Sequence, residues 1–146
     1  RWTTRLWSIE NWIDLAKMVA AAGYTPLLLG GAQEHERNLA IQAGSGATYL
    51  GHYPLQQFIN LIDQCNLVVT QVTMGMHLTL GLGKKIVLMN NIFNPHEFDL
   101  FNKGAIVQPP KECKCFYRGS CVDGNSCMDT LEPTVVMQQV ESVLHP

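Results

Sequence analysis

The sequence predicts an α/β fold: a Rossmann-like parallel sheet with flanking helices, in one domain that covers all 146 residues. Three observations predict it. Apolar residues repeat at helical spacing in three segments, short apolar runs separate these segments, and the runs are continuous rather than alternating. Continuous runs are typical of strands that are covered on both faces. Strands that alternate with helices favour a parallel, doubly wound sheet with right-handed crossovers.

The first predicted helix covers residues 9–19, where the apolar residues share one face. Ser8 stands at the N-cap position, and Gly23 lies just past the expected end. The second helix repeats the spacing over residues 55–62. It follows Pro54, a residue suited to a first helical turn.

The third predicted helix covers residues 136–144, behind Pro133. Runs of strand length lie between the helices. The four predicted strands are residues 27–29, 67–69, 86–89 and 105–107. One segment, residues 108–132, has no clear periodicity and holds four of the five cysteines, so we expect it to be irregular.

Charge and hydropathy exclude several classes of protein. Ten basic and twelve acidic residues give a net charge of −2, which argues against binding of nucleic acid or of an acidic membrane surface. The longest apolar stretch, near residues 18–29, is interrupted by Gly23, Thr25 and Pro26, so it is no transmembrane segment. We expect a cytoplasmic protein, at most peripheral at the inner membrane face. The first residue is Arg1 rather than Met, and we expect the chain to be a piece of a larger protein.

Ligands of such a sheet bind in the loops beyond the carboxyl ends of the strands. The first such loop contains Gly30 and Gly31, which let the backbone come close to a ligand. Glu34 or Glu36 could accept hydrogen bonds from ribose hydroxyls. The alternative is an ordinary turn whose acidic residues favour a helix N-terminus.

The second loop, residues 71–77, leads into a short apolar helix. Backbone N–H groups at that helix start, with Thr73 and Gly75, would form a diphosphate site. His77 could bind a phosphate or be a structural histidine with internal partners. The loop has no carboxylate for Mg²⁺. The third loop, residues 90–97, is polar enough to line a sugar, but its Asn and Pro residues are also common in turns.

The irregular segment holds four clustered cysteines. Such a cluster in a cytoplasmic protein indicates a structural Zn or Fe site, with reduced structural thiols as the alternative. Cys65 precedes an apolar strand and is interpreted as a small core residue. The predicted metal ligands are Cys113, Cys115, Cys121 and Cys127.

The order of these signals resembles the carboxyl-terminal half of the family-nine glycosyltransferases, whose best-known members are the lipopolysaccharide heptosyltransferases. The resemblance runs from about Arg5 to Leu144. The motifs that carry it are Arg5-Leu6-Trp7, Leu27-Leu28-Leu29-Gly30-Gly31 with Glu34, Leu50-Gly51, Leu67-Val68-Val69-Thr70 with Thr73, Met76-His77-Leu78, Leu82-Gly83-Lys84-Lys85-Ile86-Val87, and the four clustered cysteines with Met128.

The resemblance implies the donor-binding half of a bacterial GT-B glycosyltransferase, with a nucleoside-diphosphate-sugar as donor and no organic cofactor. Arg5 matches a family lysine that contacts donor phosphates. Glu34 or Glu36 matches a glutamate at the nucleoside, and the phosphate-binding turn and its histidine match Thr73, Met74 and His77. The family reads Asp-Thr-Gly in this turn, whereas this chain reads Val72-Thr73-Met74-Gly75, so the donor geometry cannot be copied from heptosyltransferases.

The family's acceptor-binding domain and general base would lie in an N-terminal half that this chain does not contain. We therefore expect no catalytic residue here, and no turnover by this chain alone. The whole enzyme would transfer a sugar to a cell-surface glycan or a lipid-linked acceptor. Two alternatives stay open: a non-catalytic α/β interaction module with a metal site at the cysteines, and a nucleotide-sugar epimerase or another GT-B enzyme with a similar half.

Overall fold

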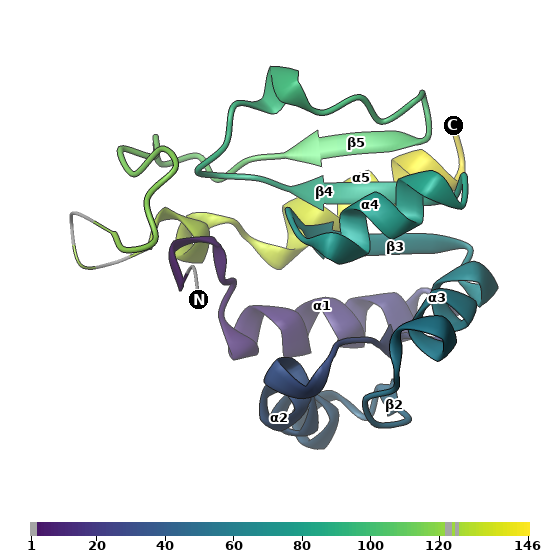
Figure 1. The fold of residues 1–146 in the computed structure, drawn as a ribbon. Coiled ribbons are helices and arrows are strands. Elements are labelled where there is room, and N and C mark those ends of the chain that lie inside the picture. Colours follow the sequence, from purple (N-terminus) through teal and green to yellow (C-terminus); the bar gives the residue numbers. More distant parts are fainter. Residues whose placement is uncertain (1–2, 122–123, 125) are drawn as a thin grey trace.

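The computed structural model describes residues 3–121, 124 and 126–146 of the chain; Arg1 and Trp2 lie outside this part. Parallel strands and helices alternate along it (Figure 1). The strands are β1 (Leu27–Leu28), β2 (Thr48–Tyr49), β3 (Leu67–Gln71), β4 (Lys85–Met89) and β5 (Gly104–Val107). The α-helices are α1 (Ile9–Ala21), α2 (His35–Ser45), α3 (Leu55–Gln64), α4 (Met74–Gly81) and α5 (Pro133–Leu144).

The described strands form two parallel sheets rather than the single sheet predicted. One pairs β1 with β2, and the other has the order β3-β4-β5. Strand β2 has only two residues and no apolar run, which is why its sequence gave no strand signal. The helix α2 was not predicted by periodicity either, because its apolar face is weak.

Local capping follows the sequence closely at α1. The Ser8 hydroxyl accepts a hydrogen bond from the Asn11 amide at 3.1 Å, as its N-cap position predicts. Pro133 occupies the first turn of α5. Pro54 is instead the N-cap of α3, one position before the first turn that we predicted. The helix itself begins at Leu55, as predicted, and ends two residues later than the predicted range of 55–62.

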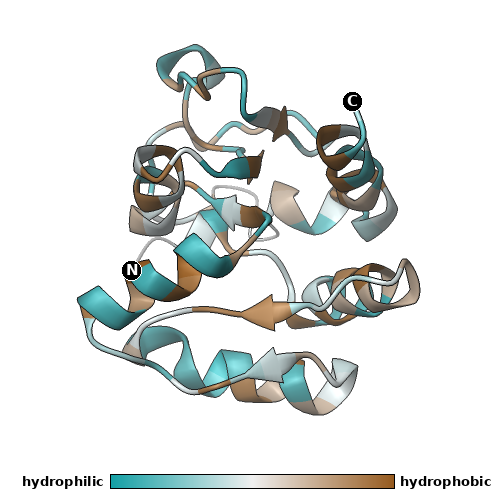
Figure 2. Cartoon of the chain, turned by 90° about the vertical axis from the view of Figure 1, so that its right-hand side faces the viewer, coloured by the Kyte–Doolittle hydropathy of each residue, from teal (hydrophilic) through white to brown (hydrophobic). Residues whose placement is uncertain are grey.

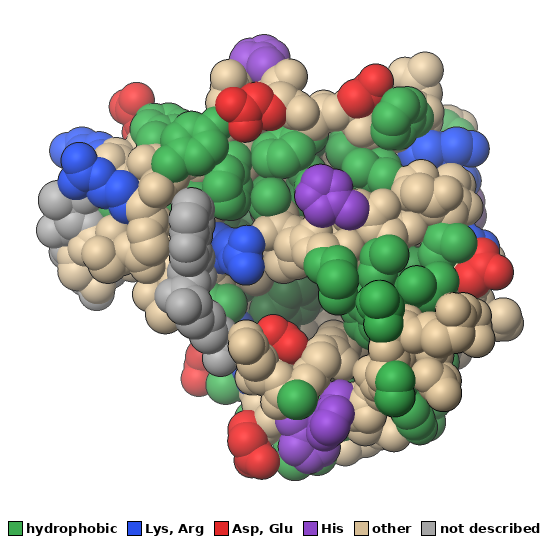
Figure 3. All heavy atoms as spheres, in the orientation of Figure 1, with side chains coloured by type: hydrophobic (Ala, Val, Ile, Leu, Met, Phe, Trp, Pro, Cys, Tyr) green, Lys and Arg blue, Asp and Glu red, His purple; other side chains and the backbone are tan. Residues whose placement is uncertain are grey.

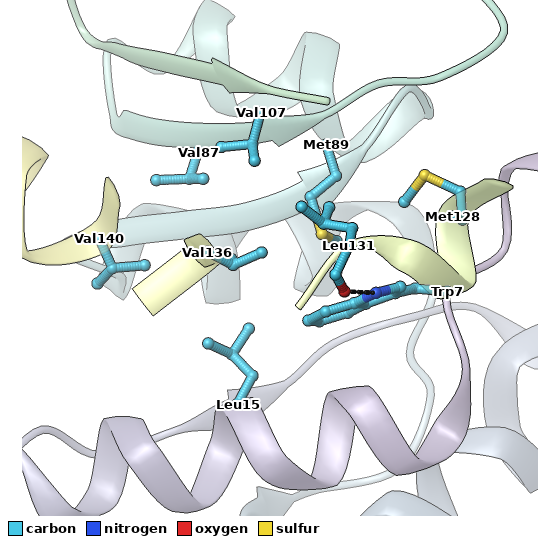
Figure 4. Packing of buried hydrophobic residues seen from close by; sticks show 9 residues of the cluster. All are labelled: Trp7, Leu15, Val87, Met89, Val107, Met128, Leu131, Val136 and Val140. Atoms are coloured by element: carbon cyan, nitrogen blue, oxygen red, sulfur yellow. Dashed lines mark hydrogen bonds between the residues drawn. The ribbon is translucent and has the colours of Figure 1, made fainter. Parts of the chain in front are cut away.

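The three-stranded sheet is buried on both faces. The β4 residues Val87 and Met89 face α1 and α5, while Ile86 and Leu88 face α4. The strands are accordingly mostly hydrophobic, whereas the helices have mixed hydropathy (Figure 2). The larger core cluster comprises Trp7, Leu15, Val87, Met89, Val107, Met128, Leu131, Val136 and Val140 (Figure 4).

Trp7 fixes the start of the chain onto this core. Its side chain is fully buried, and its indole N–H donates a hydrogen bond to the Leu131 carbonyl at 3.0 Å (Figure 4). Burial of an indole contributes several kcal/mol, on the order of 3–5 by truncation. The short helix η1 (Thr3–Arg5), two residues before Trp7, is therefore held close to the sheet. In the described part of the chain, no helix is both long and apolar enough to cross a membrane.

Candidate functional site

The turn between β3 and α4 offers backbone donors to a ligand. Thr73 is the N-cap residue of α4, but its side chain does not cap the helix; its hydroxyl oxygen lies 3.3 Å from the Thr70 hydroxyl. The Met76 amide already bonds the Thr73 carbonyl at 3.1 Å. The backbone amides of Met74 and Gly75 come before Met76 in the first turn of α4, which is the position where helix N-termini bind anions.

Gly75 keeps this turn open. A Cβ atom at Gly75 would lie 3.3 Å from the Thr73 hydroxyl and 3.7 Å from the Thr70 hydroxyl. A side chain would therefore crowd the Thr73 hydroxyl and touch the Thr70 hydroxyl. Met74 is more than half exposed, so the turn itself is at the surface.

Arg5 lies beside this turn. Its guanidinium donates a hydrogen bond to the carbonyl of Val72, the residue before Thr73, although 67 positions separate the two partners in the sequence. Arg5 is half-buried, in the last position of η1. The cation and the helix N-terminus are thus on the same side of the molecule, and both favour an anion.

Helix α2, which follows the loop after β1, contacts the same segment at Trp7. Arg37 of α2 donates a hydrogen bond to the Trp7 carbonyl, two residues after Arg5. The segment from Arg5 to Trp7 therefore contacts the β3–α4 turn at one end and α2 at the other. The space-filling view shows the surface hollowed between α4 and α2 on this face (Figure 3).

Within the first loop, the glycines have different roles. A Cβ atom at Gly30 would lie 2.8 Å from the Glu34 Cβ and 2.9 Å from the Asn38 amide nitrogen, so Gly30 is needed for packing. The Gly31 amide donates to the Glu34 carboxylate at 2.9 Å. Glu34 thus caps its own turn, as the ordinary-turn alternative predicts, while Glu36 is exposed in the first turn of α2.

His77 is exposed on α4, one turn beyond Thr73. It borders a cavity of about 530 Å³ between α4 and the chain before β5. The side chains that line this cavity are Met76, His77, Leu80, Glu97, Phe98, Asp99 and Phe101, together with Gly81. His77 therefore borders the cavity on the flank of α4.

The third polar loop is occupied by structural hydrogen bonds. The Asn90 side chain bonds the Phe93 carbonyl at 2.7 Å, and the Asn94 side chain caps the short helix η3 (Pro95–Glu97). The Asn91 amide donates to the Thr4 carbonyl at 2.8 Å. These asparagines therefore act as turn residues, one of the two alternatives that the sequence left open.

The four clustered cysteines lie together with Ile92. The Cys115 and Cys121 sulfur atoms are 3.6 Å apart, and the Cys115 amide donates to the Cys113 sulfur at 3.3 Å. Burial, together with the contact with the Cys127 thiol, raises the pKa of the Cys113 thiol to about 11. Across the described residues, no group of three or more His, Cys, Asp and Glu side chains is arranged to hold a metal ion, so the metal site stays a prediction.

Sequence reasoning missed the residues that hold η1. Thr4 is buried; its hydroxyl donates to the Arg118 carbonyl at 2.8 Å, and its own carbonyl accepts from Asn91 and from Ser126. These partners lie 87 to 122 positions away in the sequence. No local pattern signals contacts of that range.

Comparisons with known proteins agree with the observed α/β fold. Residues 1–118 match the sequence profile described as Glycosyltransferase family 9 (heptosyltransferase). The chain belongs to glycosyltransferase family 9. A search of curated protein sequences found no match. The family and the α/β fold of the GT-B type, both predicted from the sequence, are confirmed.

Solved structures of this family share the fold. The E. coli heptosyltransferase WaaC with ADP is 22% identical, with a TM-score of 0.73 over 94% of this chain and 39% of its own. The glycosyltransferase family 9 protein from Veillonella parvula DSM 2008 is 17% identical, with a TM-score of 0.77 over 97% of this chain and 42% of its own. This chain thus spans about two fifths of their length.

Proposed function

We propose that this chain is the donor-binding half of a glycosyltransferase that uses a nucleoside-diphosphate-sugar. The observation that carries the proposal is the contact of Arg5 with the Val72 carbonyl, which sets a guanidinium beside the N-terminus of α4. A diphosphate in this position would accept hydrogen bonds from Arg5 and from the amides of Met74 and Gly75. The Thr73 hydroxyl lies at the same turn.

The reaction would be a displacement at the anomeric carbon of the donor sugar. The bond from that carbon to the diphosphate oxygen breaks, so negative charge grows on the leaving diphosphate. Arg5 and the helix-terminal amides would stabilise this charge more in the transition state than in the bound substrate, which lowers the barrier. A general base in a separate acceptor-binding domain would take the proton of the acceptor hydroxyl.

The nucleoside would lie toward the first loop. Gly31 is exposed in this loop, and Glu36 is exposed in the first turn of α2, which follows the loop. The Glu34 carboxylate already accepts from Gly31, so a ribose hydroxyl would have to share it. The solved WaaC structures contain ADP and an ADP-heptose analogue. We therefore propose an ADP-linked sugar as the first donor to examine, used on the cytoplasmic side for a cell-surface glycan or lipid-linked acceptor.

Isothermal titration calorimetry with ADP, UDP, GDP and CDP tests the proposal. We expect one diphosphate to bind, and the affinity to fall roughly tenfold or more in Arg5→Ala, because a hydrogen bond to a charged group contributes about 1.5–3 kcal/mol. Thr73→Val should weaken binding by about threefold to tenfold. The matched controls, Lys17→Ala and Thr134→Val, change exposed residues of α1 and α5 and should leave affinity unchanged.

Two outcomes would overturn the donor site. The first is that no nucleotide binds to correctly folded protein, which favours the interaction-module alternative. The second is that a nucleotide binds with equal affinity to the wild type and to Arg5→Ala.

A further inference from the structure

A short surface loop, residues 115–121, begins and ends at a cysteine. The sulfur atoms of Cys115 and Cys121 are in contact at 3.6 Å. A disulfide has a sulfur–sulfur distance of about 2.05 Å, so these two atoms would have to approach by only about 1.5 Å. Cys115 is buried, whereas Cys121 is partly exposed. A small oxidant would therefore meet Cys121 first.

This loop holds η1, the element that ends at Arg5. The Arg118 carbonyl accepts the Thr4 hydroxyl at 2.8 Å, and the Gly119 carbonyl accepts the Thr3 hydroxyl at 3.3 Å. Both carbonyls lie between the two cysteines. We call residues 115–121, together with these two hydrogen bonds, the clasp.

A second set of bonds joins the cysteine cluster to η1. The Ser126 hydroxyl and the Asn91 amide both donate to the Thr4 carbonyl, at 2.9 and 2.8 Å. The same Asn91 amide lies 3.3 Å from the Cys127 sulfur. These bonds connect the cysteine cluster to Thr4, one residue before Arg5.

We propose that Cys115 and Cys121 form a reversible disulfide that locks the clasp and so raises the affinity of the Arg5 site for a nucleoside diphosphate. The effect on affinity rests on the proposed function. With a peroxide as oxidant, Cys121 is oxidised to a sulfenic acid while the peroxide is reduced to water. The Cys115 thiolate then attacks that sulfur, and the hydroxyl leaves as a second water molecule. A dithiol reductant reverses the reaction.

The direction of the effect follows from the freedom of the loop. In the dithiol state the clasp ends are joined only by non-covalent contacts, among them the contact of the two sulfur atoms at 3.6 Å, so ordering η1 costs free energy when the donor binds. A covalent closure removes part of that freedom beforehand, and a preorganised site binds more tightly. Cys115 is the attacking thiol because its sulfur atom is already in contact with the sulfur atom of Cys121.

The test compares the reduced chain with the chain oxidised by a slight excess of hydrogen peroxide. Peptide mapping should find the Cys115–Cys121 link with the loss of two hydrogen atoms, and calorimetry should find ADP bound about threefold more tightly after oxidation. Both changes should vanish in Cys121→Ser and persist in the matched control Cys65→Ser, which changes the C-cap residue of α3. Metal content is measured on the same samples.

The proposal is overturned by any of three results: a different pairing of the cysteines, a stoichiometric zinc or iron ion bound by all four, or a mapped disulfide with unchanged ADP affinity. If ADP binds neither form, the proposed function fails instead. The effect of the disulfide on η1 is then measured by amide hydrogen exchange of residues 3–7. Slower exchange after oxidation supports it, and equal exchange contradicts it.

Discussion

The two sides of the candidate site are built differently. The turn before α4 follows directly from β3, which pairs with β4 along its whole length, so the turn is positioned by a buried sheet. Arg5, on the other side, belongs to a three-residue helix that is positioned by side-chain bonds from Thr4, Asn91 and Ser126. A sheet fixes a turn through many small contacts, whereas η1 depends on a few bonds.

This difference teaches which part of the site can respond to conditions. Removing one bond from a paired sheet changes little unless it separates the strands, because the neighbouring bonds remain. Removing one bond from η1 removes a larger share of the contacts that hold the residue next to Arg5. The side of η1 and the clasp is therefore the part of the site on which regulation would act.

The largest loss of stability is expected from a substitution between two paired strands of the three-stranded sheet. A Cβ atom at Gly104 would lie 1.7 Å from the Ile86 carbonyl oxygen, so Gly104→Ala must push β5 away from β4. We expect a loss of roughly 3 kcal/mol or more, seen as a thermal midpoint about 10 °C lower or as insoluble protein.

Gly81→Ala is the control for this substitution, since a Cβ atom at Gly81 has no neighbour within 4 Å. It should leave the thermal midpoint nearly unchanged. Equal midpoints for the two variants would contradict the close packing of β5 against β4 at Gly104.

A smaller and more local effect is expected from Thr4→Val. The valine keeps the buried volume but removes the 2.8 Å bond to the Arg118 carbonyl. Stability should fall by about 1 kcal/mol, and nucleotide affinity by about threefold to fivefold, because η1 loosens while the sheet stays intact. Calorimetry and thermal melts measure the two quantities.

Thr3→Val is the matched variant, because the Thr3 hydroxyl is exposed and its bond to Gly119 is longer, at 3.3 Å. It should change affinity by less than about twofold. A larger loss of nucleotide affinity in Thr3→Val than in Thr4→Val would contradict the stronger role assigned to the Thr4 bond.

The smallest effect is expected on folding stability at alkaline pH, through the Cys113 thiol. Because the pKa of Cys113 rises from 9.0 to about 11 in the folded protein, the unfolded chain loses this proton first. The stabilisation is complete below pH 9.0 and is lost as the pH rises toward about 11. Chemical denaturation of the wild type should therefore lose more stability across this interval than Cys113→Ala does. Parallel pH profiles for the two proteins would contradict the assigned environment.

Sequence reasoning succeeded where the determinants are local. The apolar runs of β3 and β4 and the cap at Ser8 are written in neighbouring residues, and the glycines and the threonine of the turns mark the ends of strands. It failed for β2, whose two residues contain no apolar run, and for the partners of Thr4, which come from distant loops. The proximity of Arg5 to Thr73 was expected only through the family resemblance, and the structure supplies its physical link through Val72.

The central claim is that one anion site is shared by the N-terminus of α4 and Arg5. Backbone amide NMR during a titration with ADP tests it most directly, because the shifts report where the diphosphate lies. We predict the largest shifts at Thr73, Met74 and Gly75, with smaller ones at Gly30 and Gly31, and the loss of this pattern in Arg5→Ala. Shifts confined to residues 50–64, or an unchanged pattern in Arg5→Ala, would contradict the claim.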